Sequence, residues 1–348
     1  MIKVGVIGCG KIAITRHLPE YASNPDAEIA GVYDFNLERA KEVAEQYQTR
    51  AYESVEEMLN DPQIEAVSVC VRNSDHSKVT VDALRAGKHV LCEKPMAVSL
   101  DECKEMVKTA EKTGKKLMIG HNQRFNRTHM KAKELIQNGA IGKVLSFKTT
   151  FGHGGPETWT IDKKNVWFFD KRFSAFGAMA DLGVHKTDLL IFLLETKVKK
   201  VTAVLKTLDK KDAEGNLINV DDNAICIYEM ENGAVGTMTA SWTYYGEEDN
   251  STIIYGSEGI LKIYDDPNYS IVRIGKDGTK IYYELDKMQT NDNQTKSGII
   301  DSWVAAIKND TVPEVNGKDA LDATHRYLYY NCSTFRDFAK AAKGLPDE

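Results

Sequence analysis

The feature that most constrains the fold is the segment VIGCGKIA at residues 6–13, in which an apolar strand pattern at residues 2–8 ends and a helical pattern begins. Gly8, Gly10 and Ala13 have the spacing Gly-x-Gly-x-x-Ala. The first glycine can make a tight turn, the second lets the backbone approach a pyrophosphate, and the alanine permits close packing of helix on strand. The free amides at the start of the helix then face the phosphates. The segment therefore predicts a dinucleotide site.

The first third of the chain alternates short apolar runs with helical patterns. The patterns predict strands at 2–8, 27–34, 50–54, 66–71, 89–93 and 116–121, and helices at 11–24, 36–48, 54–61, 77–87 and 100–114. Alternating strands and helices indicate a doubly wound parallel sheet, and nearly unbroken apolar strands fit a sheet covered on both faces. We therefore expect an α/β domain of the Rossmann kind over residues 1–122.

The pattern changes after about residue 122. Helices are expected at 128–139 and 180–195, near 295–309 and at 318–343, and strands at 143–152, 198–208, 223–230, 234–245, 251–256, 259–265, 270–275 and 280–285. Glycine and Asn-Gly pairs separate several of these strands, as in antiparallel hairpins. A chain of 348 residues suggests about two domains. We therefore expect residues 123–348 to form an α+β domain with a mostly antiparallel sheet.

Composition limits the compartment and the partners. The net charge of −6 argues against a nucleic-acid partner and leaves a small molecule as the expected one. The six cysteines are scattered without a Cys-x-x-Cys pair, which is typical of buried thiols in a reducing compartment. The N-terminus lacks the layout of a signal peptide, and no apolar stretch approaches the ~20 residues needed to span a bilayer. We therefore expect a cytoplasmic protein with no membrane partner.

The second predicted strand ends at Asp34, which lies 26 residues after Gly8. This is where the ribose-binding carboxylate of a dinucleotide site is expected. A carboxylate accepts hydrogen bonds from ribose hydroxyls but repels a 2′-phosphate. Phe35 and Asn36 supply no cation to offset that repulsion, and Arg39 lies a turn into the helix. The expected cofactor is therefore NAD rather than NADP.

Two further groups of residues carry the chemistry. Glu93, Lys94 and Pro95 stand at the end of a predicted strand, where ligands collect in an open parallel sheet. Asp181 and His185 are four residues apart in a predicted helix and therefore share one face. An imidazole can take a hydroxyl proton, and a lysine ammonium can stabilise a developing alkoxide.

The Gly-x-Gly-x-x-Ala turn, the Glu-Lys-Pro and the Asp-x-x-x-His together resemble the Gfo/Idh/MocA oxidoreductases. ALRAGKHVLCEKP at 83–95 and ADLGVHKTDLLIFLL at 180–194 are the most specific stretches, and the match runs through essentially the whole chain. The resemblance implies an open antiparallel sheet in the second domain, through which the chain would form a homodimer or homotetramer. It also implies a Lys-Pro bond that is often cis.

The resemblance assigns catalytic roles to Lys94, Asp181 and His185, with Asp181 orienting His185. The predicted cofactor-binding residues, from the turn and from the resemblance, are Gly8, Gly10, Lys11, Ile12, Ala13, Asp34, Phe35, Asn73, His76, Glu93 and Lys94. The resemblance places Asn122, Arg124, His153 and Trp159 near the cleft or the substrate. Trp167 is expected to add an apolar stacking face for a sugar ring, and Phe176 is expected to reshape the pocket. Val71-Arg72 replaces the family's Thr-Pro, and Gly177 alone remains of its glycine run. Because of these departures, the substrate of a particular family member cannot be assigned to this chain.

These observations predict an NAD-dependent oxidoreductase acting on a secondary alcohol of a sugar, inositol or related polyol, or on the matching ketone. One alternative is glycoside cleavage assisted by tightly bound NAD, and another is a sensor that binds NAD without turnover. Asp181 and His185 could also ligate a metal with His121 and His153, but neither of those histidines has a ligand-like spacing to the pair. No metal is therefore expected.

Overall fold

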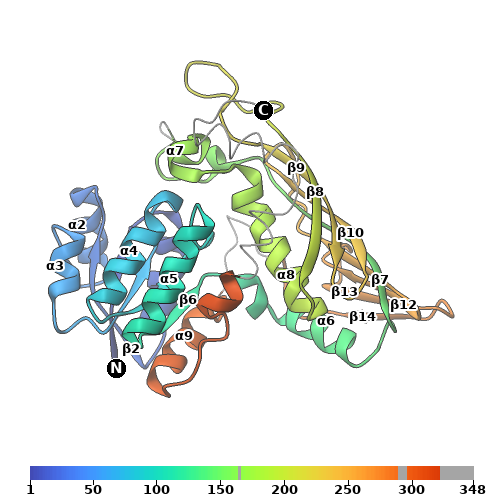
Figure 1. Cartoon of the computed structure of the whole chain (residues 1–348), viewed down its shortest axis with the longest axis horizontal. Helices are drawn as coiled ribbons and strands as arrows, with labels where there is room; N and C mark the ends of the chain where they lie inside the picture. The colour runs from blue at the N-terminus through green and yellow to red at the C-terminus, as the bar shows by residue number, and fades with distance from the viewer. Residues whose placement is uncertain (164–165, 289–295, 322–348) are drawn as a thin grey trace.

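The first part of the chain is a parallel sheet with helices on both faces (Figure 1). The computed structural model describes residues 1–163, 166–288 and 296–321. Its first sheet has the order β3-β2-β1-β4-β5-β6, and every neighbouring pair is parallel. The strands are β1 (Ile2–Ile7), β2 (Ala27–Tyr33), β3 (Arg50–Ala51), β4 (Ala66–Val69), β5 (His89–Cys92) and β6 (Leu117–Ile119). The expected Rossmann sheet is confirmed, and the order reverses between β1 and β4, where such sheets bind their ligands.

The helices between these strands follow the predicted pattern with two differences. They are η1 (Ala13–His17), α1 (Leu18–Ala22), α2 (Leu37–Gln46), α3 (Val55–Asn60), α4 (Asn73–Arg85) and α5 (Leu100–Thr113). Helix α4 begins four residues before the expected position. The first helical stretch opens with a π-helical turn, η1, just before Pro19. Proline has no N–H to donate, which favours irregular hydrogen bonding in the turn before it.

The second part is built on an eight-stranded mixed sheet of order β14-β13-β12-β11-β7-β10-β9-β8. Strands β10 and β7 pair in parallel and all other neighbours are antiparallel, which confirms a mostly antiparallel sheet. The strands are β7 (Val144–Gly152), β8 (Val198–Lys206), β9 (Asn223–Met230), β10 (Val235–Ser241), β11 (Thr252–Gly256), β12 (Gly259–Ile263), β13 (Ile271–Gly275) and β14 (Lys280–Tyr283).

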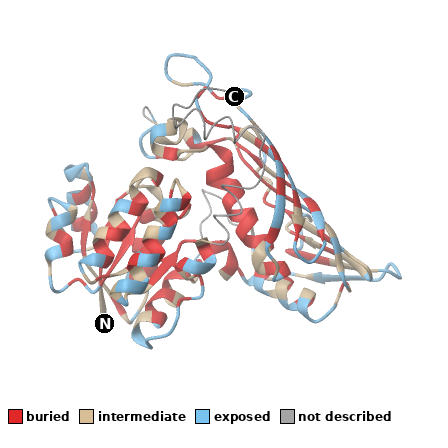
Figure 2. Cartoon of the chain, viewed as in Figure 1, coloured by how far each residue is buried: buried red, intermediate tan, exposed pale blue. Residues whose placement is uncertain are grey.

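One face of this sheet is covered by helices, and the other is open (Figures 1 and 2). The helical elements are η2 (Asn122–Phe125), α6 (Arg127–Gln137), η3 (Pro156–Thr158), η4 (Trp167–Phe169), α7 (Lys171–Ser174), η5 (Met179–Gly183) and α8 (Val184–Leu194). Helix α8 is buried along nearly its whole length between the sheet and the first part of the chain. Apolar side chains such as Val204, Ile225 and Ile227 remain about half exposed on the open face.

The chain returns to the first part after the second sheet. Helix α9 (Ile299–Lys308) packs Ile300 and Trp303 into the core beneath the parallel sheet. Ser297, just before the helix, donates to the buried carboxylate of Glu20. The helix expected near 295–309 is therefore present, whereas most of the one expected at 318–343 lies outside the described residues. The division of the chain at residue 122 stays a prediction.

Candidate active site

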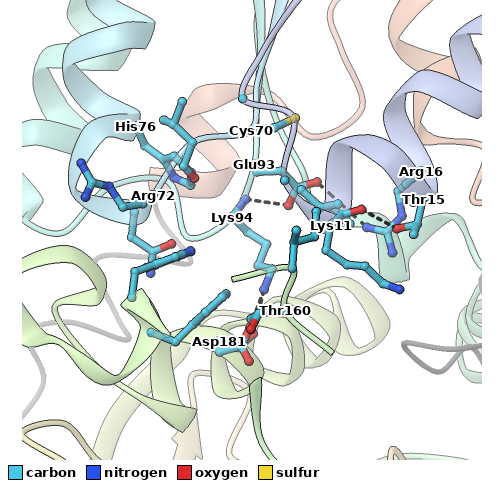
Figure 3. A pocket seen from close by; sticks show the side chains of 18 of the residues that line it. Lys11, Thr15, Arg16, Cys70, Arg72, His76, Glu93, Lys94, Thr160 and Asp181 are labelled. Atoms are coloured by element: carbon cyan, nitrogen blue, oxygen red, sulfur yellow. Dashed lines mark hydrogen bonds and ion pairs between the residues drawn. The ribbon is translucent and has the colours of Figure 1, made fainter. Parts of the chain in front are cut away.

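A cleft of about 1120 Å³ lies where the carboxyl ends of the parallel strands face the second part of the chain (Figure 3). The turn after β1, the end of β2 and the end of β5 contribute to one wall. Residues between β7 and α8, together with α8 itself, contribute to the opposite wall. The two groups of residues that the sequence singled out are therefore in one cavity.

The turn after β1 has the geometry of a phosphate-binding turn. Gly8 has φ of +99°, and a Cβ there would lie 2.4 Å from the carbonyl oxygen of Cys70 in the neighbouring chain segment. A side chain at Gly10 would meet nothing within 4 Å, so that a ligand can approach the backbone. Lys11 and Ile12 line the cleft, whereas Ala13 is fully buried and packs into the core. The turn fits a dinucleotide pyrophosphate.

Asp34 is held at the end of β2 by main-chain amides. Its Oδ2 accepts from the Cys9 N–H at 2.8 Å and its Oδ1 from the Asn36 N–H at 2.8 Å. The guanidinium of Arg39 lies 3.6 Å from the same Oδ1, because the first turn of α2 brings this side chain back toward β2. Phe35 is 79% exposed and also lines the cleft. Asp34 and Phe35 therefore both face the cleft at the end of β2.

Glu93 is buried at the end of β5 and belongs to a polar network. Its Oε1 lies 2.9 Å from Nε2 of His17, and the other ring nitrogen of His17 lies 3.1 Å from the Ser68 hydroxyl. Burial opposes ionisation of Glu93, but His17, Arg16 and Lys94 outweigh burial and lower its pKa to about 2. Glu93 is therefore a carboxylate at neutral pH and fixes the loop that presents Lys94.

Lys94 points across the cleft to the second part of the chain (Figure 3). Its Nζ donates to Oδ1 of Asp181 and to the main-chain oxygen of Asp181, both at 3.0 Å. The Lys94–Pro95 bond is cis, as the resemblance implied. The Pro95 carbonyl oxygen lies 2.7 Å from Nδ1 of His76, which is buried at the start of α4. Asn73, from the same turn of α4, donates to the Ser174 carbonyl at 3.1 Å.

Asp181 contacts Lys94 rather than His185. Its second carboxylate oxygen accepts from Nε1 of Trp242 at 3.2 Å, and no hydrogen bond joins it to His185 among the described residues. Asp181 lies in the π-helical turn η5, which precedes α8. The expectation that the two side chains share a face assumed a regular α-helix, and a π turn changes that alignment. The structure thus gives Asp181 a different partner from the expected one.

His185 lies in the cleft as a neutral ring. Burial, together with the positive charge of Lys94 and the nearby His121, holds its pKa well below the usual range. Its Nδ1 is buried and has no hydrogen-bond partner within the described part of the chain. The ring of Phe151 packs against it, with centroids 5.8 Å apart. The neutral imidazole of His185 therefore keeps one unprotonated ring nitrogen, which can accept a proton.

The expected substrate residues separate into two groups. Asn122, His153, Trp159 and Trp167 line the cleft. Trp167 stacks on Phe168 and Trp159 meets Phe168 edge-on, which makes an aromatic wall. Arg124 and Phe176 are not among the lining residues. The guanidinium of Arg124 pairs with the buried carboxylate of Asp188, and Phe176 packs against the core of the second part.

The sequence analysis missed several residues that line or shape the cleft. The side-chain oxygens of four buried amides in the cleft lack a hydrogen-bond partner among the described residues: Asn122, Gln123, Asn126 and Asn250. Buried polar atoms are nearly always paired, so these amides offer acceptors to ordered water or to a polar ligand. Gln123 lies between the predicted Asn122 and Arg124 in HNQRFN, and Asn126 follows two residues later, so that this segment was a usable signal. Nothing in the sequence connected Asn250 or Trp242 with the site.

The fold and the cleft together define an NAD(P)-binding oxidoreductase with a Rossmann domain. Residues 2–121 match the sequence model of the oxidoreductase family with an NAD-binding Rossmann fold, GFO_IDH_MocA. Residues 129–262 match the GFO/IDH/MocA C-terminal domain. The chain belongs to the Gfo/Idh/MocA family. It is accordingly an oxidoreductase with an NAD-binding Rossmann fold.

Relatives support the family and the fold. The chain is 26% identical over 323 residues to myo-inositol 2-dehydrogenase of Thermotoga maritima, which covers 91% of this chain and 92% of that protein. It is 33% identical over 235 residues to glucose-6-phosphate 3-dehydrogenase of Bacillus subtilis, covering 67% and 65%. An oxidoreductase from Agrobacterium radiobacter, crystallised with NAD+, L-tartaric acid and magnesium, superposes with a TM-score of 0.82 at 22% identity, covering 99% and 97%. The last comparison shows the fold alone.

Composition also led to the expectations of buried free thiols and of no membrane-spanning segment. Cys9, Cys70, Cys92, Cys103 and Cys226 are free and buried, and Cys332 lies outside the described residues. In residues 1–163, 166–288 and 296–321, no helix is long and apolar enough to cross a membrane. The same residues contain no group of three or more metal-ligating side chains.

Proposed function

We propose that the chain is an NAD-dependent dehydrogenase that oxidises a secondary alcohol of an uncharged sugar, inositol or polyol, or reduces the matching ketone. The observation that carries this proposal is the contact of Lys94 with Asp181 in the same cleft as the dinucleotide turn and the neutral His185. Bound NAD would supply the acceptor for the hydride of the alcohol carbon.

Three side chains of the cleft have separate roles in the transfer of the hydroxyl proton. The ammonium of Lys94 can donate a hydrogen bond to the substrate oxygen and stabilise the negative charge that develops on it. Asp181 holds Lys94 through one carboxylate oxygen and its own main-chain carbonyl. His185 is unprotonated at neutral pH because burial lowers its pKa, so its ring can accept the hydroxyl proton. Lys94 and His185 are thus the proposed catalytic residues, and Asp181 is a positioning residue.

The cofactor would be held by the turn after β1 and by Asp34. Gly8 and Gly10 leave room for the pyrophosphate, and Asp34 would accept from the ribose hydroxyls. The carboxylate of Asp34 repels a 2′-phosphate, which favours NAD over NADP. Asn73, His76 and Glu93 support this wall of the cleft.

The charge of the cleft wall that the second part contributes favours an uncharged substrate. The second part of the chain contributes four charged lining residues among those described: Asp162, Lys163, Asp181 and Glu248. Asp162 and Asp181 pair with cations of the first part. No arginine of the described second part lines the cleft, although arginine is the preferred partner of phosphate and carboxylate groups. Unpaired amides and an aromatic wall suit hydroxyl groups and the apolar face of a sugar ring.

A substrate panel tests this proposal. The full chain is incubated with NAD or NADP and with myo-inositol, glucose, glucose 6-phosphate or gluconate, and reduction is followed at the nicotinamide absorbance. We expect reduction of NAD by an uncharged polyol, with kcat/KM at least about tenfold higher than for its phosphorylated form. A preference for the phosphorylated or acidic substrate contradicts the charge argument. Cleavage of a glycoside without added NAD would favour NAD-assisted glycoside cleavage, and binding without any turnover would favour a sensor.

We also propose that the open face of the second sheet is an interface between copies of this chain in a homodimer or homotetramer. Exposed apolar side chains on neighbouring strands, such as Val204, Ile225 and Ile227, support this proposal. Light scattering of the wild type and of Ile225→Glu tests it, because a monomeric wild type refutes the interface. The buried free cysteines support a cytoplasmic location.

A further inference from the structure

A segment of the second part of the chain reaches the end of the cleft where Asp34 lies. Ile161, Asp162 and Lys163 line the cleft together with Phe35 and Arg39, which come from the end of β2 and the start of α2. The segment leaves η3 through a hydrogen bond from the Thr160 N–H to the Pro156 carbonyl at 2.9 Å. Residues separated by more than a hundred positions therefore form one wall beside the proposed ribose site.

The contact that joins the two parts here is between Arg39 and Asp162. Nη2 of Arg39 donates to Oδ1 of Asp162 at 2.7 Å, and Nη1 lies 3.6 Å from Oδ1 of Asp34. The Arg39 side chain is 14% exposed, that of Asp34 is 4% exposed and that of Asp162 is 46% exposed. One guanidinium is thus shared by two carboxylates, one from each part of the chain.

A guanidinium at this place has two possible roles. Arginine binds phosphate groups well because its planar fork offers parallel N–H donors. Arg39 lines the cleft next to the ribose carboxylate, so an unpaired guanidinium would attract the 2′-phosphate of NADP. Asp162 occupies the guanidinium instead and adds a second negative charge to the wall.

We propose that Asp162 is a cofactor-specificity residue. This role of Asp162 rests on the proposed function, because it concerns the same dinucleotide site. Asp34, which belongs to the first part of the chain, repels a 2′-phosphate. Asp162 pairs with Arg39, so that this cation does not compensate the repulsion. The preference for NAD is therefore set jointly by both parts of the chain.

The proposal differs from a merely structural ion pair in what it predicts. Loss of a structural pair would weaken or leave unchanged the binding of both cofactors alike. Loss of a specificity residue changes the ratio of the two affinities, because Arg39 becomes available to one ligand and not to the other. This change in the ratio of the two affinities also requires Arg39. It becomes smaller at high salt, because the contact between Arg39 and Asp162 is partly exposed.

Equilibrium binding of NAD and NADP to the full chain tests the proposal. The readout is calorimetry, with the wild type, Asp162→Asn, the double variant Asp162→Asn/Arg39→Gln and the control Asp265→Asn. Asp265 pairs with Lys262 at 2.6 Å at the end of β12 and does not line the cleft. We expect Asp162→Asn to lower the Kd of NADP about tenfold and to change that of NAD less than about threefold. The double variant should lose this gain, and the control should match the wild type.

Three outcomes overturn the role of Asp162. The first is an unchanged ratio of the two Kd values in Asp162→Asn, and the second is an equal weakening of both cofactors. The third is a gain for NADP that persists in the double variant, since another cation such as Lys163 would then bind the phosphate. If the wild type binds neither dinucleotide, the proposed function itself falls, whereas an unchanged ratio in a protein that binds NAD refutes the role of Asp162 alone.

Discussion

Replacing Asp181 with asparagine removes one negative charge from the cleft with almost no change of shape. In the wild type, Nζ of Lys94 donates to Oδ1 and to the main-chain oxygen of Asp181, both at 3.0 Å. The variant keeps the main-chain acceptor and the side-chain volume, and it loses the charge-assisted bond. We expect Lys94 to remain in the cleft with a less defined position.

The size of the expected loss in kcat/KM follows from the burial of Lys94 and Asp181. The side chains of Lys94 and Asp181 are 15% and 6% exposed. At this separation and an effective dielectric constant of about 20, the direct attraction is about 5.5 kcal/mol, and desolvation of the two groups offsets part of it. A hydrogen bond to a charged group is worth about 1.5–3 kcal/mol net. If about 2–3 kcal/mol of transition-state stabilisation is lost, kcat/KM falls roughly 30- to 160-fold.

Steady-state kinetics with the best substrate of the panel, together with the Kd of NAD, measure the effect. We expect kcat to fall and the Kd of NAD to change less than about threefold, because Asp34 and the turn after β1 are untouched. Trp242→Phe is the matched control, since it removes the 3.2 Å hydrogen bond to Asp181 but keeps the charge. It should cost clearly less than the asparagine variant.

The reasoning is refuted if Asp181→Asn retains the kcat of the wild type. It is also refuted if the losses in Asp181→Asn and Lys94→Ala multiply in the double variant. A positioning residue acts through its partner, so the double variant should be no worse than Lys94→Ala.

Three further predictions concern buried groups. Burial lowers the pKa of Lys186 to about 7, so between pH 7 and 9.5 the unfolded chain binds more protons than the folded one. The free energy of unfolding, measured in urea, should therefore rise with pH by up to about 1.4 kcal/mol per pH unit. The variant Lys186→Met should lose this slope. Glu93 has its pKa lowered to about 2 by its cationic neighbours despite burial; the stability gap between wild type and Glu93→Gln should be constant above pH 5 and shrink by about 3 kcal/mol as the pH falls toward 2. A Cβ at Gly177 would lie 1.8 Å from the carbonyl oxygen of Asp221, whereas one at Gly154 has no neighbour closer than 3.6 Å; Gly177→Ala should therefore lower both the melting temperature and kcat, and Gly154→Ala should leave the melting temperature unchanged.

The elements that the sequence predicted best are those fixed by local pattern. The alternation of apolar strands and helices predicted the parallel sheet, because each βα unit buries its own apolar face. Lys94 and Asp34 follow directly on strands of that sheet, so their position at its ligand-binding edge followed from the topology. The relative directions of the Asp181 and His185 side chains were predicted less well. The reason is that the π-helical turn at Asp181 has no simple sequence signal.

Contacts between the two parts of the chain were beyond prediction. The pair Arg39–Asp162 depends on how the second part sits against the first, which a local pattern does not contain. The pair Arg124–Asp188 is similar, since only the packing of η2 against α8 removes the guanidinium from the cleft. Residue type alone suggested that Arg124 binds a ligand, and a buried carboxylate partner competed for it.

Transfer of deuterium tests the central claim most directly. The best polyol substrate is labelled with deuterium at the carbon that is oxidised, and the reduced nicotinamide is isolated from the reaction of the wild type and of Lys94→Ala in ordinary water. The account predicts that the wild type places the deuterium on the nicotinamide without exchange and that Lys94→Ala does so at least about a hundredfold more slowly. Loss of the label to water, or an undiminished rate in Lys94→Ala, would contradict it.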